Sequence, residues 1–99
     1  MKFSITWQIS QDKWLPVLET WTGLTPEQRA DAGEGVKIIG RWHDLANRSG
    51  VLIVESADIG AVSRYLGVWN PHMEINIVPV VDDEESAAVA RQILAANKS

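Results

Sequence analysis

The sequence predicts one α+β domain, residues 1–99, with the element order β-α-β-β-α-β and a terminal helix. Alternating apolar residues mark four short strands, and two segments with helical spacing separate the first strand from the second and the third from the fourth. Two split βαβ units with right-handed crossovers then give a four-stranded antiparallel sheet in the order 4-1-3-2. Both main helices cover one face of this sheet and leave the other bare.

The first half of the chain contains one strand and two helices. Residues 2–9 (KFSITWQI) alternate between apolar and polar side chains, which is typical of a half-buried strand. Residues 11–21 (QDKWLPVLETW) space their apolar side chains as a helix does, and Pro16 must then lie in the first turn. A short second helix follows, with Thr25 as the expected N-cap and Gln28 as its capping-box partner.

The second half supplies three strands. Residues 35–45 and 51–56 predict two strands joined by ANRSG, a loop in which Gly50 can take a positive φ. The segment MEINIVPVV predicts the fourth strand. Pro79 within it has no amide hydrogen to donate, so this strand is expected at an edge of the sheet.

Two further helices are expected. The first, over residues 56–69, has Ser56 or Asp58 as its cap and ends at Asn70. The terminal helix spans about residues 83–96, begins with acidic residues and ends near Lys98, as the helix dipole favours. Its apolar stripe consists of Val89, Ile93 and Ala96.

Composition excludes several classes of protein. The chain is 45% hydrophobic and 22% charged, with a net charge of −4 and no lysine- or arginine-rich block, which argues against nucleic-acid binding. Without cysteine it can form neither disulfides nor thiolate zinc sites. No apolar run approaches the ~20 residues of a membrane helix, and no signal peptide is recognisable, so we expect no membrane partner and a cytoplasmic location.

Five tryptophans in 99 residues are unusual. They can be large core residues that help a small domain bury enough area, or they can line an aromatic pocket. Since most of them fall on predicted core stripes, the first interpretation is favoured.

The face of the sheet without helices, here called the open face, is predicted from the alternation. It carries polar groups such as Thr6, Gln8 and Asn76 beside aliphatic residues. On the second strand, Arg41 and His43 are expected on the open face and Trp42 in the core. The matching hairpin register places Arg41 opposite Glu55 and His43 opposite Ile53. Because exposed aliphatic area usually marks an interface, we expect a homodimer through this face, with the polar groups enclosed in a cavity.

The stretch GRWHD, residues 40–44, holds the best candidate site. Arg41 can anchor an anionic or carbonyl oxygen and His43 can act as an acid or base, while Glu55, Thr6, Gln8 and Asn76 complete the expected ligand-binding set. In the alternative interpretation, Arg41 forms a structural ion pair with Glu55 and His43 bonds locally. Asp44, at the strand end, is expected to order the ANRSG loop.

Other motifs are weak. His43, His72 and a glutamate could approach one another, but no metal-ligand motif is present, so no metal site is expected. Asn70 and Pro71 in WNPH more simply end a helix. No phosphate-binding loop, dinucleotide fingerprint or nucleophile elbow occurs, and we expect no cofactor.

Several segments together resemble a known family: MKFSITW, GVKIIGRWHD, VLIVES, YLGVWN and INIVPVVDDEE. They resemble a small bacterial family of domains of unknown function, with GRWH as its most recognisable element. That family is similar in architecture to the dimeric α/β-barrel, ferredoxin-like proteins. The resemblance implies this fold and a dimer but no particular activity, since the wider superfamily includes both enzymes and ligand-sensing domains.

Two functional hypotheses follow. In the first, a homodimer binds a small anionic or carbonyl-bearing molecule in the cavity between its two sheets. In the second, the protein is a non-catalytic dimerisation or interaction module whose interface is filled by side chains. The sequence leaves open whether the protein is an enzyme.

Overall fold

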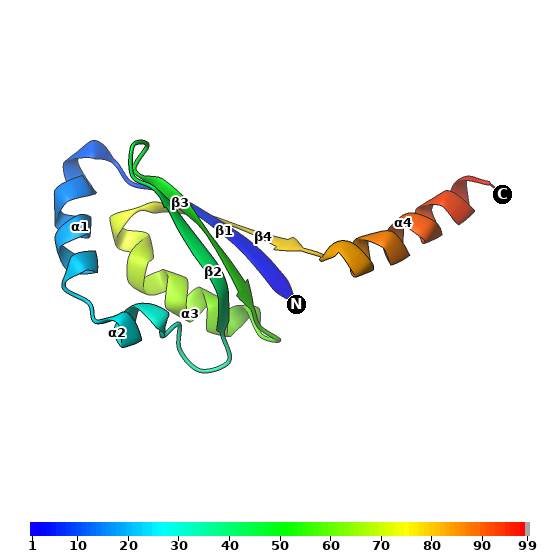
Figure 1. Cartoon of the computed structure of the whole chain (residues 1–99), viewed down its shortest axis with the longest axis horizontal. Coiled ribbons are helices and arrows are strands. Elements are labelled where there is room, and N and C mark those ends of the chain that lie inside the picture. Colours follow the sequence, from blue (N-terminus) through cyan, green and yellow to red (C-terminus); the bar gives the residue numbers. More distant parts are fainter. Residues whose placement is uncertain (99) are drawn as a thin grey trace.

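The computed structural model describes residues 1–98 and has an α+β architecture built on one antiparallel sheet (Figure 1). The sheet has the order β2-β3-β1-β4, which reads β4-β1-β3-β2 from the opposite edge. Its strands are β1 (Lys2–Gln8), β2 (Lys37–Asp44), β3 (Ser49–Glu55) and β4 (Glu74–Val80). The helices are α1 (Trp14–Thr22), α2 (Pro26–Ala30), α3 (Ile59–Trp69) and α4 (Asp83–Asn97), with short 3-10 turns η1 (Gln11–Lys13) and η2 (Asn70–His72).

Local sequence signals set the starts of α2 and α3 as expected, whereas the helix expected over residues 11–21 begins only at Trp14, after the 3-10 turn η1. The Thr25 side chain accepts from the Gln28 N–H at 3.1 Å while the Gln28 side chain accepts from the Thr25 N–H at 2.8 Å, so the capping box of α2 is complete. Asp58 caps α3 through the Gly60 N–H. Pro16 lies in the first turn of α1, where it interrupts no helical hydrogen bond. The predicted edge position of the strand containing Pro79 is confirmed.

The core lies between the sheet and α3. Phe3 and Ile5 of β1 project toward the helices together with Leu52 and Val54 of β3, and Val62 of α3 packs against them. Ile5, Val54 and Val62 are at most 1% exposed. The alternation predicted for β1 and β3 is therefore correct, because each buried residue is followed by one that faces the other side.

In β2 the alternation is interrupted by a β-bulge. Ile38 is opposite Val54, but Gly40 is already opposite Ile53, so Ile39 is an additional residue on the bulged strand. A bulge of one residue reverses the side on which every later side chain of the strand lies. Arg41 is consequently opposite Leu52, a core residue, and His43 is opposite Gly50.

This register corrects several predictions for the hairpin. Arg41 does not face Glu55, and His43 does not face Ile53. Both lie on the helix-covered face, whereas Trp42, predicted in the core, is 60% exposed on the open face. The strands also reach closer to the turn than expected, so that Arg48 and not Gly50 takes a positive φ, of 52°. Asp44 does order the loop, since its carboxylate accepts from the Asn47 N–H and side-chain amide.

Two strand glycines make room for tryptophan rings. A Cβ on Gly40 would overlap the Trp42 ring on the open face. A Cβ on Gly50 would overlap the Trp7 ring and lie 2.6 Å from the Trp42 carbonyl oxygen. Because Gly50 stands between Trp7 and His43 in the sheet, its missing side chain lets these two rings meet across it.

The terminal helix α4 stands apart from the domain. It projects beyond the end of β4 (Figure 1), and the molecule is accordingly 57 Å long but only 29 × 20 Å across. All described residues of α4 are exposed, including Val89, Ile93 and Leu94. The predicted helix is present, but its apolar residues are not buried against the core formed by the other described residues.

Replacing Gly50 with alanine should destabilise the fold by about 1–3 kcal/mol, because the added methyl group forces the Trp7 ring or the β2 backbone to move. Gly67→Ala is the matched control. A Cβ on Gly67 meets nothing within 4 Å, and alanine favours the helix by up to ~1 kcal/mol. Urea unfolding measures both, and equal stability of the two variants would contradict the close ring contact.

Candidate functional site

A pocket of about 330 Å³ lies between the sheet and helices α1 and α3. Its lining is mostly apolar and includes four of the five tryptophans: Trp7, Trp14, Trp21 and Trp69. The spacing of α1 turns Trp14, Val17, Leu18 and Trp21 toward it, and α3 adds Tyr65, Leu66 and Trp69. The aromatic-pocket interpretation of the tryptophans thus describes them better than the core interpretation, since none of these four is fully buried.

Arg41 reaches this pocket from β2. Its Nη2 donates to the Tyr65 hydroxyl at 3.0 Å, and its guanidinium lies 4.9 Å from the centre of the Trp21 ring. Among residues 1–98 the ion pairs join Lys2 to Glu55 and Asp82, so Arg41 has no carboxylate partner. The predicted alternative of an Arg41–Glu55 ion pair is therefore wrong.

His43 lies in a row of aromatic rings. Its imidazole is 5.5 Å from the Trp7 ring, edge to face, and 5.2 Å from the Trp21 ring, which in turn is 6.2 Å from Trp69. His43 is an exposed residue at the mouth of the pocket, and its ring contributes to the pocket lining. Burial against these rings lowers the pKa of His43 below its usual 6.5, and the nearby charge of Arg41 lowers it further. His43 is thus a neutral imidazole at neutral pH, with one ring nitrogen that donates a hydrogen bond and one that accepts.

The charges around the pocket have one sign. A shallower depression next to it shares Trp21, Arg41 and His43 and adds Arg29 and Lys37. Neither lining contains an aspartate or glutamate, although the whole chain has a net charge of −4. This local excess of positive charge favours an anion at the mouth of the pocket.

The remaining predicted site residues lie elsewhere. Alternation places the side chains of Thr6, Gln8 and Asn76 on the other side of the sheet, where Thr6 is opposite Asn76. They line a separate shallow depression that also includes Trp7 and Ile75. The Gln8 side chain donates to the Asn47 carbonyl oxygen at 2.7 Å and so holds the β2–β3 loop. Glu55 pairs with Lys2 at 3.1 Å. The sheet therefore separates these four residues from Arg41 and His43.

Sequence reasoning missed Tyr65 and Trp21 as partners of Arg41 because it assigned Arg41 to the wrong side of the sheet. The signal that could have found them is Gly40. An isolated glycine within a strand often marks a bulge, and a bulge at this point reverses the side of Arg41 and His43.

The sequence of the chain matches the model of one protein family. A family model described as a domain of unknown function, DUF3303, matches residues 1–94. The chain belongs to this family. Comparison with curated proteins and with solved structures finds no match to the DUF3303 chain.

Across residues 1–98, histidine, aspartate and glutamate side chains form no group of three or more that could hold a metal ion. No helix in the same range is both long enough and apolar enough to cross a membrane.

The lowered pKa of His43 makes folding stability depend on pH. Because the fold disfavours the imidazolium, the free energy of unfolding should have its full value above pH 6.5, the ordinary pKa of histidine. It should decrease as the pH falls through 6.5 toward the lowered pKa of the folded state. Proton NMR titration, with the resonance assigned by His43→Gln, should show a pKa below 6.5. Arg41→Gln should raise the pKa of His43 only part of the way to 6.5, since burial is the larger cause of the lowered pKa. Titration of His43 above 6.5 would contradict the burial of its ring.

Proposed function

We propose that this DUF3303 protein binds a small, largely apolar molecule with a carboxylate or carbonyl group in the pocket between the sheet and helices α1 and α3. The observation that carries the proposal is Arg41, a cation held among aromatic side chains without a carboxylate partner in residues 1–98. The volume of about 330 Å³ lies within the range of small-molecule sites. The proposed ligand cavity thus lies within one chain and not between the sheets of two chains.

The polar groups suit an anionic oxygen. Tyr65 accepts a hydrogen bond from Arg41, so its own hydroxyl proton remains available to a ligand. The free donors of the Arg41 guanidinium can bind both oxygens of a carboxylate. The tryptophan rings would cover the apolar part of the same molecule.

His43 is the residue through which the site could also act on a bound carbonyl compound. Its lowered pKa keeps the imidazole neutral at neutral pH, which is the form that a general base needs. The first role of the site in this proposal is binding, and proton transfer by His43 is the added step that would make the protein an enzyme.

Thermal unfolding with matched probes tests the binding function. 3-Phenylpropionate at ten times its Kd should stabilise the protein by about 1.4 kcal/mol, or roughly 5–10 °C for a domain of this size. The uncharged 3-phenylpropionamide should have a much smaller effect, and Arg41→Gln should abolish the difference between the two probes.

Arg64→Gln is the control, because Arg64 is an exposed cation on α3 outside the pocket lining. It should respond to both probes as the unsubstituted protein does. The binding function would be refuted if no member of a series of aromatic and aliphatic carboxylates stabilised the protein. It would also be refuted if these compounds stabilised the Arg41→Gln variant equally.

We further propose a ferredoxin-like fold of the dimeric α/β-barrel kind, with GRWH as a family motif. The β-α-β-β-α-β order and the antiparallel sheet support the fold. Homodimerisation through the open face is supported by its exposed apolar residues, with Ile39 49%, Trp42 60% and Val78 51% exposed. A cytoplasmic location and a bacterial source agree with the same resemblance.

The oligomeric state tests the dimer. Analytical ultracentrifugation should find a dimer that Val78→Glu converts to monomers, because a carboxylate would be buried without a partner at the interface. Val68→Glu is the matched control. Val68 is 66% exposed on α3, away from the sheet, and its replacement should leave the dimer intact.

A further inference from the structure

Two arginines contact the ring of Trp21, which lines both the pocket and the shallower depression next to it. The guanidinium carbon of Arg41 lies 4.9 Å from the ring centre, and that of Arg29 lies 5.7 Å from it. Arg41 lines both hollows, whereas Arg29 belongs to the lining of the depression. The pocket and the depression therefore adjoin at one indole ring that holds two cations.

The guanidinium of Arg29 is fixed at one end and free at the other. Its Nε donates to the Leu24 carbonyl oxygen at 3.2 Å, in a contact that is partly buried. Among residues 1–98, neither of its terminal nitrogens, Nη1 and Nη2, has a hydrogen-bond or ion-pair partner. The backbone contact and the indole ring thus orient the group, while its remaining N–H donors can bind an anion.

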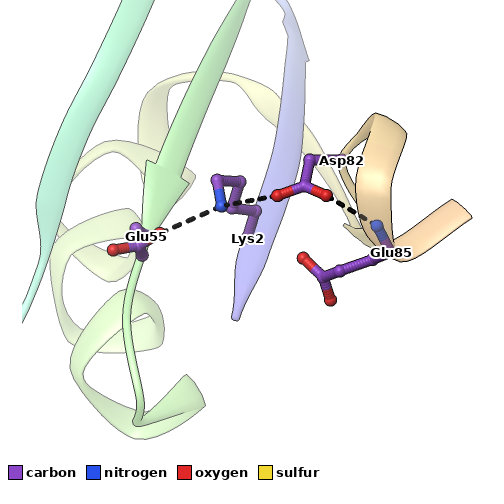
Figure 2. Close-up of polar contacts among 4 residues, drawn as sticks. All are labelled: Lys2, Glu55, Asp82 and Glu85. Carbon is purple, nitrogen blue, oxygen red and sulfur yellow. Dashed lines mark hydrogen bonds and ion pairs between the residues drawn. The ribbon is translucent and has the colours of Figure 1, made fainter. Parts of the chain in front are cut away.

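Lys2 shows how a cation on this sheet is balanced elsewhere (Figure 2). Its ammonium lies 3.1 Å from the Glu55 carboxylate and 3.6 Å from the Asp82 carboxylate. The two arginines at Trp21 have no such ion pair within residues 1–98, and no aspartate or glutamate lines the depression. Because two cations near one ring repel each other, a ligand with two negative charges suits this place better than a ligand with one.

We propose that Arg29 binds a second acidic group of the ligand, and that the ligands of this site are dicarboxylic acids with an apolar body. The inference rests on the proposed function, since the pocket and Arg41 hold the apolar body and the first carboxylate. The second carboxylate then binds Arg29 in the depression. The different linings of the two hollows support this division, because the pocket is mostly apolar and the depression is bordered by cations.

The spacing of the two arginines limits the length of such a ligand. The two distances to the Trp21 ring keep the guanidinium carbons within about 11 Å of each other, and a bidentate carboxylate has its carbon about 4 Å from the guanidinium carbon. Carboxyl groups separated by two or three carbon atoms are roughly 4–5 Å apart when extended. A diacid of this length can therefore reach one arginine with each carboxylate.

Matched ligands test the second subsite by isothermal titration calorimetry. 2-Benzylsuccinate and 2-benzylglutarate are 3-phenylpropionate with a second carboxylate on a short branch, two or three carbon atoms from the first. At least one of them should bind about tenfold more tightly than 3-phenylpropionate, because it gains one charge-assisted pair. The monoamides of the two diacids, which keep the size but lose one charge, should bind no more tightly than 3-phenylpropionate.

Substitutions locate the gain at Arg29. Arg29→Gln should remove the tenfold gain and change the affinity for 3-phenylpropionate by less than about threefold. Arg29→Lys keeps the charge and should retain part of the gain, and circular dichroism shows whether both variants are folded. Arg64→Gln is the matched control, because it removes an equal charge from an exposed position on α3 outside both linings, and it should retain the whole gain.

The second subsite would be overturned if neither diacid bound more tightly than 3-phenylpropionate. It would also be overturned if the gain persisted in Arg29→Gln, fell equally in Arg64→Gln, or was lost together with the binding of 3-phenylpropionate. The proposed function is judged apart from these results, by the binding of 3-phenylpropionate to the unsubstituted protein and its loss in Arg41→Gln. If none of the three acids bound, both the proposed function and the second subsite would be wrong.

Discussion

The extra residue in β2 determines on which side of the sheet the chemistry of this protein lies. Ile38 and Gly40 pair with consecutive residues of β3, and Ile39 between them has no place in the regular ladder. From that point on, side chains that would have faced the open side turn toward the helices. Arg41 and His43 therefore lie in a pocket lined by aromatic rings and not on the flat, solvated open face. The same shift places the Trp42 indole on the open face.

Two glycines, one in β2 and one in β3, make this arrangement possible. The Trp42 ring covers Gly40 on one face, and the Trp7 ring covers Gly50 on the other. Any side chain at Gly50 would separate Trp7 from His43, which now meet at 5.5 Å. The contacts that lower the pKa of His43 therefore depend on a residue that has no side chain of its own.

Much of the fold follows from local signals in the sequence, and the position of the site does not. Pro79 predicts an edge strand because it lacks a donor, and Thr25 and Gln28 predict the start of α2 because their side chains satisfy the free amides there. Strict alternation predicts β1 correctly. In β2 it fails, because the alternation is a property of a regular ladder and a single inserted residue reverses it. The partners of Arg41 come from helices distant in sequence, and only the three-dimensional packing brings Tyr65 and Trp21 to it.

Stability alone gives a poor account of Arg41. Holding a guanidinium among indole rings removes part of its hydration. Within the described part of the chain, the compensation comes from one tyrosine hydroxyl and a cation–π contact, with no carboxylate in an ion pair. An aliphatic side chain in the same place could fill the space beside Leu52 without that desolvation. Four tryptophans likewise line about 330 Å³ of space where smaller apolar residues could pack into a closed core. These features lower the folding stability of a domain of this size: a partly desolvated cation, a neutral imidazole, and aromatic rings around an unfilled volume. They are what a site needs to take an apolar acid out of water, since the rings cover its body and Arg41 replaces the water around its charge.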